Sequence, residues 1–190
     1  MENGYHIKPA KPEHIPALPA IERAAADIFP EGMISDQAKD YVLSLEEFKK
    51  ALAKKHLWVA VTADNQPVGF ALVTVYASGQ SAMLAELDVD PDHQQQGLGK
   101  ALVKTVIEWA HHKGFRHLSL TTFSTIPWNA PFYEKMGFRR LSQNELTATL
   151  VAVLEKEDEL GLKNRVAMQL DLYFFTLFLG LAGQYSNITI

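Results

Sequence analysis

Residues 87–101 read Leu-Asp-Val-Asp-Pro-Asp-His-Gln-Gln-Gln-Gly-Leu-Gly-Lys-Ala. This stretch is predicted to end a strand at Val89, pass through a loop and begin a helix at Gly97 and Gly99. Free amides and the helix dipole suit such a helix start to an anion, and glycine lets a phosphate approach the backbone. The stretch lacks the spacing of a Walker A loop and, because position 102 is Leu, the GxGxxG dinucleotide fingerprint. Taken alone, it is equally consistent with a glycine-rich helix start that holds no ligand.

The sequence that follows alternates helices with strands. Apolar residues recur at a helical period over 97–112, and Gly114 is a helix stop. The later elements are predicted as a strand at 118–123, a short helix at 130–135 ending at Gly137, the start of a strand at 138–141, a helix at 145–160 and a strand at 165–172. Strands joined through helices require crossover connections, so part of the sheet is predicted to be parallel.

The sequence before residue 87 predicts two helices and an antiparallel meander. Pro16 and Pro19 are expected to delay or bend the first helix, because each lacks an amide donor. Ser44 and Glu47 form a capping box that begins the second. The expected elements are a strand at 5–10, a helix at 13–29, a helix from Ser44 to about Lys55, and strands at 57–63, 68–76 and 82–89. The predicted fold class is a single α/β domain with a mixed central sheet flanked by helices.

The composition of the 190 residues is that of an ordinary globular domain, with 47% hydrophobic and 21% charged residues. A formal net charge of −4 gives no general attraction to nucleic acid or anionic lipid. No cysteine is present, which excludes disulfides, thiolate metal sites and cysteine nucleophiles. The seven histidines are scattered or adjacent rather than paired at ligand spacing, so we expect no metal. A signal-like start and a membrane-length apolar run are both lacking, so we expect a cytoplasmic protein without a membrane partner.

Two motifs carry a family resemblance. The first is Gln94-x-x-Gly97-x-Gly99 after a strand, and the second is Trp-Asn-Ala-Pro-Phe-Tyr-Glu-Lys-Met-Gly-Phe at 128–138. In this order they resemble motif A and the N-x-x-x-x-F/Y-Y-x-x-x-G-F region of the GNAT superfamily of N-acetyltransferases. The likeness implies a single-domain GNAT acyl-CoA N-acyltransferase fold over 1–172. The sequence departs from the family pattern where members often carry arginine and this chain has glutamine.

The resemblance implies that acetyl-CoA is the co-substrate. The backbone of Leu87, Asp88 and Val89 would pair with the pantetheine arm like an added strand. Asn129 would hydrogen-bond the cofactor, cap the helix that follows it, or do both. The pyrophosphate would be held by the loop and the first helical turn, and Lys100 would supply positive charge. The residues of this predicted site are Gln94, Gln95, Gln96, Gly97, Leu98, Gly99 and Lys100.

The expected chemistry needs a base and an acid. An amine of pKa ~10.4 is almost wholly protonated at neutral pH, so it must lose a proton before it attacks a thioester. GNAT enzymes often place a carboxylate on the strand before motif A, which makes Glu86 the candidate base and Asp88 its reserve on the same strand face. Tyr133 occupies the position of the residue that protonates the departing thiolate. The alternatives are a solvated or structural Glu86 and a Tyr133 that only packs in the core.

By resemblance, the acceptor lobe lies in the first two helices and the loop between them. Its acidic and aromatic residues suit a cationic amine. Each of them is explained equally well as solvated surface. The residues of this predicted lobe are Glu22, Asp27, Phe29, Pro30, Glu31 and Asp36. Since no cysteine can carry an acyl group, we expect direct transfer in a ternary complex to a small-molecule primary amine. The alternatives are an acyl-CoA-binding sensor without turnover, or acetylation of a protein lysine or N-terminus.

Residues 173–190 form an apolar extension beyond the predicted domain. Thr176 is the only polar side chain besides Tyr173 in the first eleven of these residues. A contiguous apolar surface of this kind favours association. The extension is therefore expected to add a strand, cover the sheet or form the contact of a homodimer.

Overall fold

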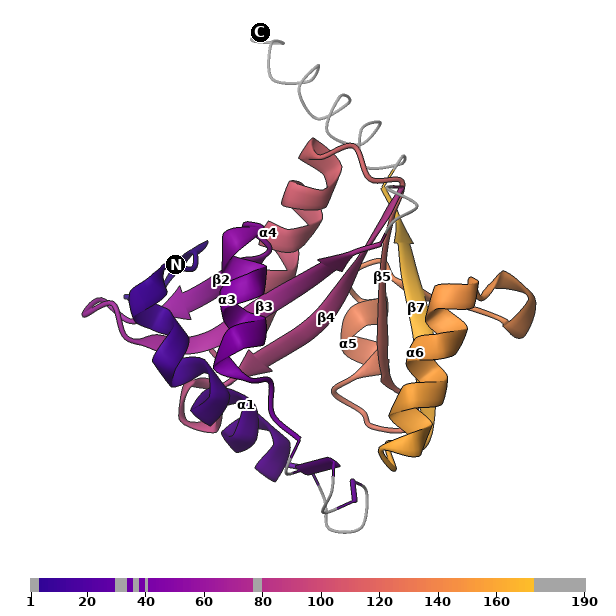
Figure 1. The fold of residues 1–190 in the computed structure, drawn as a ribbon, viewed down its shortest axis with the longest axis horizontal. Coiled ribbons are helices and arrows are strands. Elements are labelled where there is room, and N and C mark those ends of the chain that lie inside the picture. The colour runs from indigo at the N-terminus through magenta and orange to yellow at the C-terminus, as the bar shows by residue number, and fades with distance from the viewer. Residues whose placement is uncertain (1–3, 30–33, 36–37, 40, 77–79, 173–190) are drawn as a thin grey trace, which may run out of the picture.

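The computed structural model describes residues 4–29, 34–35, 38–39, 41–76 and 80–172 (Figure 1). The apolar extension at 173–190, with its expected role in a homodimer, lies outside the described residues. In chain order, with η for 3₁₀ helices, the elements are β1 (His6–Pro9), η1 (Pro12–Ala17), α1 (Leu18–Asp27), α3 (Leu45–Ala53), β2 (Leu57–Val61), β3 (Pro67–Val75), β4 (Ser81–Val89), η2 (Pro91–His93), α4 (Leu98–His112), β5 (His117–Phe123), α5 (Ala130–Glu134), β6 (Arg139–Arg140), η3 (Gln143–Glu145), α6 (Ala148–Glu159) and β7 (Arg165–Asp171).

The strands form one seven-stranded sheet in the order β1-β2-β3-β4-β5-β7-β6. Strands β1 to β4 make an antiparallel meander, and β7 is antiparallel to both of its neighbours. Strands β4 and β5 are parallel, with α4 as the crossover between them. The predicted α/β class and partly parallel sheet are confirmed.

Helices cover both faces of the sheet (Figure 1). Helices α4 and α5 pack on one face, and α1, α3 and α6 pack on the other. The central part of the larger core consists of apolar side chains of β2, β3, β4 and β5 against α4. Among the described residues, no helix is both long and apolar enough to cross a bilayer.

Both predicted helix starts are confirmed. Pro16 lies within the 3₁₀ segment η1 and Pro19 in the first turn of α1, so the α-helix begins only at Leu18. The Ser44 amide donates to Glu47 Oε2 at 2.8 Å, and the Glu47 amide donates to Ser44 Oγ at 3.3 Å. This reciprocal capping box fixes the start of α3.

Strands β4 and β5 diverge after a short paired region. Their register ends at Met83 opposite Ser119, whereas β4 continues to Val89 and β5 to Phe123. Figure 1 shows the two strands separating toward this end of the sheet. The last residues of β4 therefore pair with β3 on one side but not with β5 on the other.

A β-bulge at Ala85 decides which way the β4 side chains face. Leu84 pairs with Val73 but Glu86 pairs with Leu72, so one residue of β4 is left over. Such a bulge moves the following side chains to the opposite face of the sheet. Leu84 packs toward α4, while Glu86 and Asp88 lie on the face covered by α1, as their β3 partners do. The prediction that these two carboxylates share a face is confirmed; the bulge was not predicted.

Candidate active site

A cleft of about 680 Å³ lies where β4 ends and α4 begins, and we name it the α4 cleft. It is lined by Ala25, Ile28, Phe29, Leu87, Asp88, Val89, Gln94, Gln95, Gly97, Leu98, Gly99, Lys100, Trp128, Asn129, Phe132 and Tyr133. The predicted cofactor-binding residues all line this cleft except Gln96, which is exposed and does not. The two sequence motifs thus meet in one place.

The loop before α4 forms a concave array of amide donors. Its backbone is left-handed at Gln95 (φ 60°) and at Gly97 (φ 75°). Turns of this kind direct successive N–H groups toward one side, where they bind anions. The first helical bond joins the Ala101 amide to the Gly97 carbonyl at 3.0 Å, so the first-turn amides have no acceptor within the helix. Lys100 is exposed beside them and supplies positive charge.

The unpaired side of β4 forms a wall of the same cleft. Leu87, Asp88 and Val89 all line it, as expected for a backbone that receives an added strand. The Val89 carbonyl already accepts a hydrogen bond of 3.3 Å from Gln94 Nε2, which ties the loop to the end of β4. Gln94 therefore has a role in positioning the loop that the sequence analysis did not predict.

Asn129 does not cap α5 with its side chain, contrary to one of its two predicted roles. It occupies the N-cap position, but its side chain makes no capping hydrogen bond. Its backbone carbonyl instead accepts from the amides of Phe132 at 2.9 Å and Tyr133 at 3.3 Å. Because the backbone makes this contact, the amide side chain remains available to the cleft that it lines.

A second cavity, of about 390 Å³, lies on the far side of the gap between β4 and β5, and we name it the α6 cavity. It is lined by Glu22, Ala26, Phe29, Ile34, Ala38, Tyr41, Tyr76, Met83, Leu84, Ala85, Glu86, Leu87, Asp88, Thr121, Thr122, Phe123, Asn129, Tyr133, Val153, Lys156, Glu157, Leu160, Leu162 and Arg165. The residues common to both cavities are Phe29, Leu87, Asp88, Asn129 and Tyr133. The two spaces therefore meet at Asp88 and Tyr133.

Three carboxylates face the interior of the α6 cavity. Burial, then the Asp88 and Glu22 carboxylates, raises the pKa of Glu86 well above its ordinary value. Burial and the Glu22 carboxylate do the same to the pKa of Asp88. Burial raises the pKa of Glu22 to about 7, against the opposing hydrogen bond from the Leu43 amide. Glu22 can therefore accept and release a proton near neutral pH, and burial makes both β4 carboxyl groups weaker acids than usual.

Asp88 is distinguished from Glu86 by its position. As a whole residue Asp88 is partly exposed, but its Oδ2 atom is enclosed. Among the described residues, that atom has no hydrogen-bond partner. Asp88 lines both cavities, whereas Glu86 lines the α6 cavity and a neighbouring groove but not the α4 cleft. An unpaired carboxylate oxygen at the junction is suited to receive a proton.

Tyr133 lies in an aromatic group at the same junction. Its ring contacts Phe132 at a centroid distance of 5.0 Å and Phe138 at 5.8 Å. Burial, and then the Asp88 carboxylate, raises the pKa of the Tyr133 hydroxyl above its ordinary range. The hydroxyl therefore keeps its proton at neutral pH and can act as a hydrogen-bond or proton donor.

A buried ion pair forms another part of the α6 cavity and was missed by the sequence analysis. Arg165 donates to Glu157 Oε1 at 2.8 Å and to Oε2 at 3.1 Å, and it donates to the Thr121 carbonyl at 3.1 Å. Its guanidinium also lies over the Phe123 ring, 4.6 Å from the centroid. The only signal in the sequence was an arginine at the start of an apolar strand. Its partner lies in a separate helix, so no local pattern joins the two.

The predicted acceptor lobe is only partly correct. Glu22 and Phe29 line the α6 cavity. Asp27 is exposed and lines neither cavity, because it lies at the end of α1 on the solvent side. The remaining members of the set, Pro30, Glu31 and Asp36, lie outside the described residues.

Among the residues that the structure describes, no group of three or more His, Cys, Asp or Glu side chains is arranged to hold a metal.

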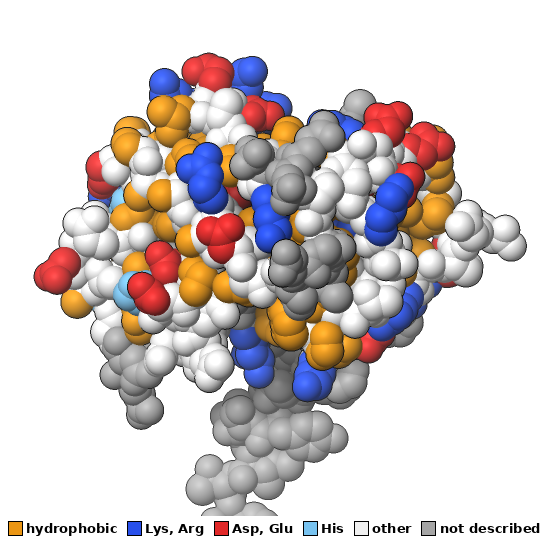
Figure 2. Space-filling view, turned by 90° about the horizontal axis from the view of Figure 1, so that it is seen from below, with side chains coloured by type: hydrophobic (Ala, Val, Ile, Leu, Met, Phe, Trp, Pro, Cys, Tyr) orange, Lys and Arg blue, Asp and Glu red, His pale blue; other side chains and the backbone are white. Residues whose placement is uncertain are grey.

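The surface at the lower edge of Figure 1 carries mixed charge. Figure 2 shows acidic and basic side chains interspersed with apolar ones on this face rather than gathered into one basic band. Trp128, which the motif contains but to which no role was assigned, is 49% exposed beside the α4 cleft.

A mixed seven-stranded sheet flanked by helices on both faces is the fold of the acyl-CoA N-acyltransferases. The model of the acetyltransferase (GNAT) family matches residues 18–138. The chain therefore belongs to this family. The predicted resemblance is confirmed.

Two relatives and one solved structure illustrate the likeness. Streptothricin acetyltransferase of Streptomyces lavendulae is 34% identical over 89 residues, covering 45% of this chain and 46% of its own length. The peptidyl-lysine N-acetyltransferase YjaB of Salmonella typhimurium is 34% identical over 107 residues, covering 56% and 66%. The matched region thus spans less than two thirds of either relative. The structure of N-acetylglutamate synthase from Neisseria gonorrhoeae with coenzyme A and N-acetyl-glutamate superposes with a TM-score of 0.67 at 21% identity, over 89% of this chain and 35% of that one.

Proposed function

We propose that this protein transfers an acetyl group from acetyl-CoA to a primary amine within a ternary complex. The observation that carries the proposal is the meeting of two separate cavities at an unpaired carboxylate and a protonated phenol, Asp88 and Tyr133. A reaction between two bound substrates needs two spaces that open onto one point, with a proton acceptor and a proton donor there.

The α4 cleft would hold the coenzyme. Its amide array, at the loop and the first turn of α4, suits the pyrophosphate, and the open side of β4 suits the amide groups of the pantetheine arm. Asn129 and Tyr133 lie deeper, at the junction, where the thioester would reach. Half-exposed Trp128 offers an apolar surface near the mouth of the cleft.

The proposed base and acid are side chains at the junction of the two cavities. The acceptor ammonium loses one proton to a β4 carboxylate, and the free amine attacks the thioester carbonyl carbon. When the carbon–sulfur bond breaks, the Tyr133 hydroxyl donates a proton to the leaving thiolate. The nitrogen releases its second proton to solvent as the amide forms, and Tyr133 regains a proton from solvent. Asp88 is the proposed immediate base because it lines both cavities, and Glu86, the first candidate from the sequence, would share its proton within the coupled pair.

A protein lysine is the second candidate acceptor. The observation that favours it is the likeness to a peptidyl-lysine N-acetyltransferase over 56% of this chain. Both candidates present a primary amine to the α6 cavity. They differ in whether the rest of the acceptor lies inside the cavity or outside the protein.

The test is calorimetric titration with acetyl-CoA followed by a thiol-release assay over small amines and a lysine-containing peptide. Binding with turnover supports the proposal and names the acceptor class. Binding without turnover of any acceptor would favour the sensor alternative. Absence of binding would show that the Gly97 loop is a helix start without a ligand, and the proposal would be wrong.

The role of Tyr133 has its own test. We expect Tyr133→Phe to lower kcat by about 10²-fold, the usual contribution of a general acid, while the Kd for acetyl-CoA changes little. The ring contacts with Phe132 and Phe138 are kept in this variant, so folding is preserved. Unchanged kcat would remove the hydroxyl from the mechanism.

A further inference from the structure

The α6 cavity is lined by more acidic side chains than basic ones. Glu22, Glu86 and Asp88 contribute three carboxylates. Arg165, a partly buried cation of the cavity, is already bound to both oxygens of Glu157, at 2.8 and 3.1 Å. That pair is neutral as a unit, so it balances none of the other three.

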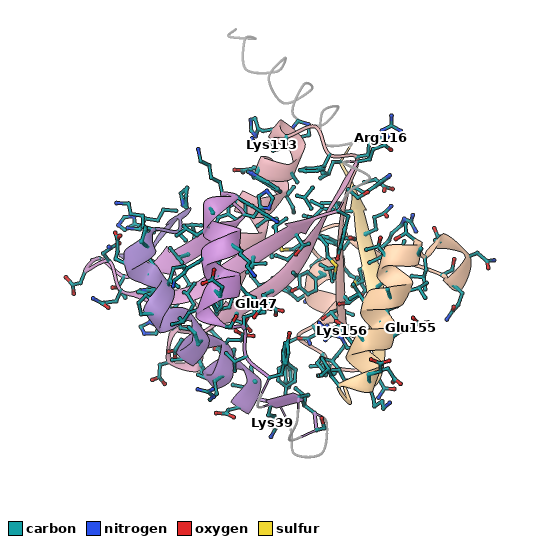
Figure 3. All side chains as sticks on the ribbon, in the orientation of Figure 1. Lys39, Glu47, Lys113, Arg116, Glu155 and Lys156 are labelled. Atoms are coloured by element: carbon teal, nitrogen blue, oxygen red, sulfur yellow. The ribbon has the colours of Figure 1, made fainter. Side chains whose placement is uncertain are left out.

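One further cation lines the cavity, as an exposed side chain. Lys156 extends from the side of α6 that faces α3 (Figure 3), and its ammonium lies 5.9 Å from the centroid of the Tyr41 ring. Arg23 is adjacent to Glu22 in the chain but is exposed and does not line the cavity. No lysine, arginine or histidine occurs among the residues outside the described part of the chain, at 1–3, 30–33, 36–37, 40, 77–79 and 173–190.

Asp88 and Glu22 both have unused acceptor capacity. Asp88 Oδ2 is enclosed and, within the described residues, has no partner. Glu22 is only 8% exposed, and among the described residues its two oxygens share a single donor, the Leu43 amide, at 3.2 and 3.1 Å. A buried carboxylate normally accepts several hydrogen bonds or pairs with a cation. Both groups thus lack partners that a bound ligand can supply.

The walls of the cavity suit an alkylammonium chain. Aromatic side chains, which attract cations through their ring faces, line it at Phe29, Tyr41, Tyr76, Phe123 and Tyr133. An acceptor with one nitrogen would bring one positive charge, and that charge is lost when the nitrogen gives up its proton to react. A second, unreactive ammonium is needed to keep a cation beside the remaining carboxylates through the reaction.

We propose that the acceptor is a diamine or polyamine, of which one nitrogen reacts beside Asp88 while a second stays protonated and pairs with Glu22. This inference rests on the proposed function and names its substrate class. The reacting ammonium gives one proton to a β4 carboxylate and attacks the thioester as the free amine. It loses its second proton to solvent as the amide forms, and coenzyme A leaves with a proton from Tyr133. The second ammonium keeps its proton and its salt bridge in substrate and product alike. Glu22 is then a specificity-determining residue, not a base.

The test compares each α,ω-diamine from 1,3-diaminopropane to 1,6-diaminohexane with the monoamine of equal chain length. Because a hydrogen-bonded charge pair contributes about 10- to 100-fold in affinity, we expect the protein to prefer its best diamine over the matched monoamine by at least about tenfold in kcat/KM. Glu22→Gln should remove most of that preference, because it should lower kcat/KM for the diamine by at least about tenfold more than for the monoamine. Glutamine keeps an oxygen for the Leu43 amide, so the variant can fold. The control is Glu155→Gln on the opposite side of α6 (Figure 3), which should change neither rate.

A titration that needs no turnover completes the test. Calorimetry with the best-bound diamine in two buffers of different ionisation enthalpy measures the protons released on binding. Burial raises the pKa of Glu22 to about 7, with Glu86, Asp88 and Glu47 as the facing acids and Arg23 as the neighbouring base, so an entering cation should expel protons at pH 7. Glu22→Gln should bind at least tenfold more weakly and release fewer protons.

Each outcome separates this inference from the proposed function. Equal kcat/KM for diamines and monoamines would overturn the inference and leave acetyl transfer intact. If no amine turns over, the proposed function is wrong for amines, and the titration alone decides whether the cavity binds a dication. Diamine binding that is the same in the protein and in Glu22→Gln would overturn the pairing with Glu22.

Discussion

The α4 cleft and the α6 cavity meet at Asp88 and Tyr133 but are built from different parts of the chain. Most of the α4 cleft comes from two short stretches, 87–100 and 128–133, and the part proposed to bind the pyrophosphate is backbone. The α6 cavity takes side chains from α1, β4, β5, α6 and β7, which are far apart in sequence. Its properties depend on which of its acids are ionised and which are paired.

This difference has a consequence for substitution. A backbone site depends on the local conformation of the chain and tolerates many side chains. A site made of buried charged side chains depends on each partner, because removing one leaves another charge unpaired. We therefore expect changes in the α6 cavity to alter turnover and stability strongly, and changes in the α4 cleft to alter coenzyme affinity moderately.

The largest expected effect is that of Asp88→Asn. Without its proton acceptor at the junction, we expect kcat to fall by about 10²- to 10⁴-fold, the usual contribution of general base catalysis. The Kd for acetyl-CoA should change only a few-fold, since the β4 backbone that lines the α4 cleft is kept. Steady-state kinetics and calorimetry on the same preparation measure the two quantities.

Glu86→Gln is the matched comparison. It removes a carboxylate that lies on the same strand face as Asp88 but does not line the α4 cleft. We therefore expect a smaller loss of kcat than for Asp88→Asn. The reverse order would make Glu86 the base, as the sequence alone suggested. Equal and small losses would place the base outside this pair.

The sequence predicted the α4 cleft well because its signals are local. The strand end at Val89, the glycines of the loop and the Asn129–Tyr133 segment lie in two motifs whose spacing is preserved in the fold. Strand periodicity predicted that Glu86 and Asp88 share a face of the sheet. The bulge at Ala85, which decides which face that is, was not predicted.

The α6 cavity was predicted poorly because its contacts are not local. Arg165 meets Glu157 only because β7 follows α6 back along the sheet, and no spacing in the sequence marks that pair. Asp27 was assigned to the acceptor lobe from its charge, but the orientation of α1 places it in solvent. Buried charge networks depend on packing, which a single sequence does not display.

A stability measurement sharpens the comparison through Arg165→Met. The Arg165–Glu157 pair is mostly buried, with side chains 16% and 14% exposed, so the variant leaves a carboxylate without its partner. We expect the free energy of unfolding to fall by about 2–3 kcal/mol, somewhat less than for a fully buried pair. Urea denaturation at pH 7 measures it.

Two further variants show whether the loss comes from the unpaired charge. Arg140→Met removes an exposed ion pair of similar length, 2.7 Å to Glu134, and should cost no more than about 0.5 kcal/mol. Arg165→Met combined with Glu157→Leu should recover part of the lost stability, because no buried charge remains. A double variant as unstable as the sum of its single changes would contradict this account.

A smaller effect, with a defined pH dependence, is expected for Glu22→Gln in the absence of substrates. Burial raises the pKa of Glu22 from 4.5 to about 7, so folding takes up a proton between these values and the free energy of unfolding falls as pH rises through them. At pH 8 the variant should be more stable than the natural protein by on the order of 1–3 kcal/mol, and at pH 4 the two should agree. Thermal unfolding across this pH range measures the difference. A variant that is less stable at pH 8 would show that the ionised Glu22 is stabilised in the empty cavity.

The smallest effects are expected in the α4 cleft, where Gly97→Ala and Gly99→Ala form a matched pair. Gly97 has φ 75° and open space around the added methyl group, so alanine there is strained and should cost about 1 kcal/mol of stability. Gly99 is helical, and its added methyl group would lie 3.9 Å from Phe132 and 4.0 Å from Val89, in ordinary contact. Gly99→Ala should therefore keep or slightly raise stability, since alanine favours the helix, but weaken acetyl-CoA binding because the methyl group enters the cleft. If Gly99→Ala bound acetyl-CoA normally, the first turn of α4 would not be in contact with the coenzyme, and the α4 cleft would hold it elsewhere along β4.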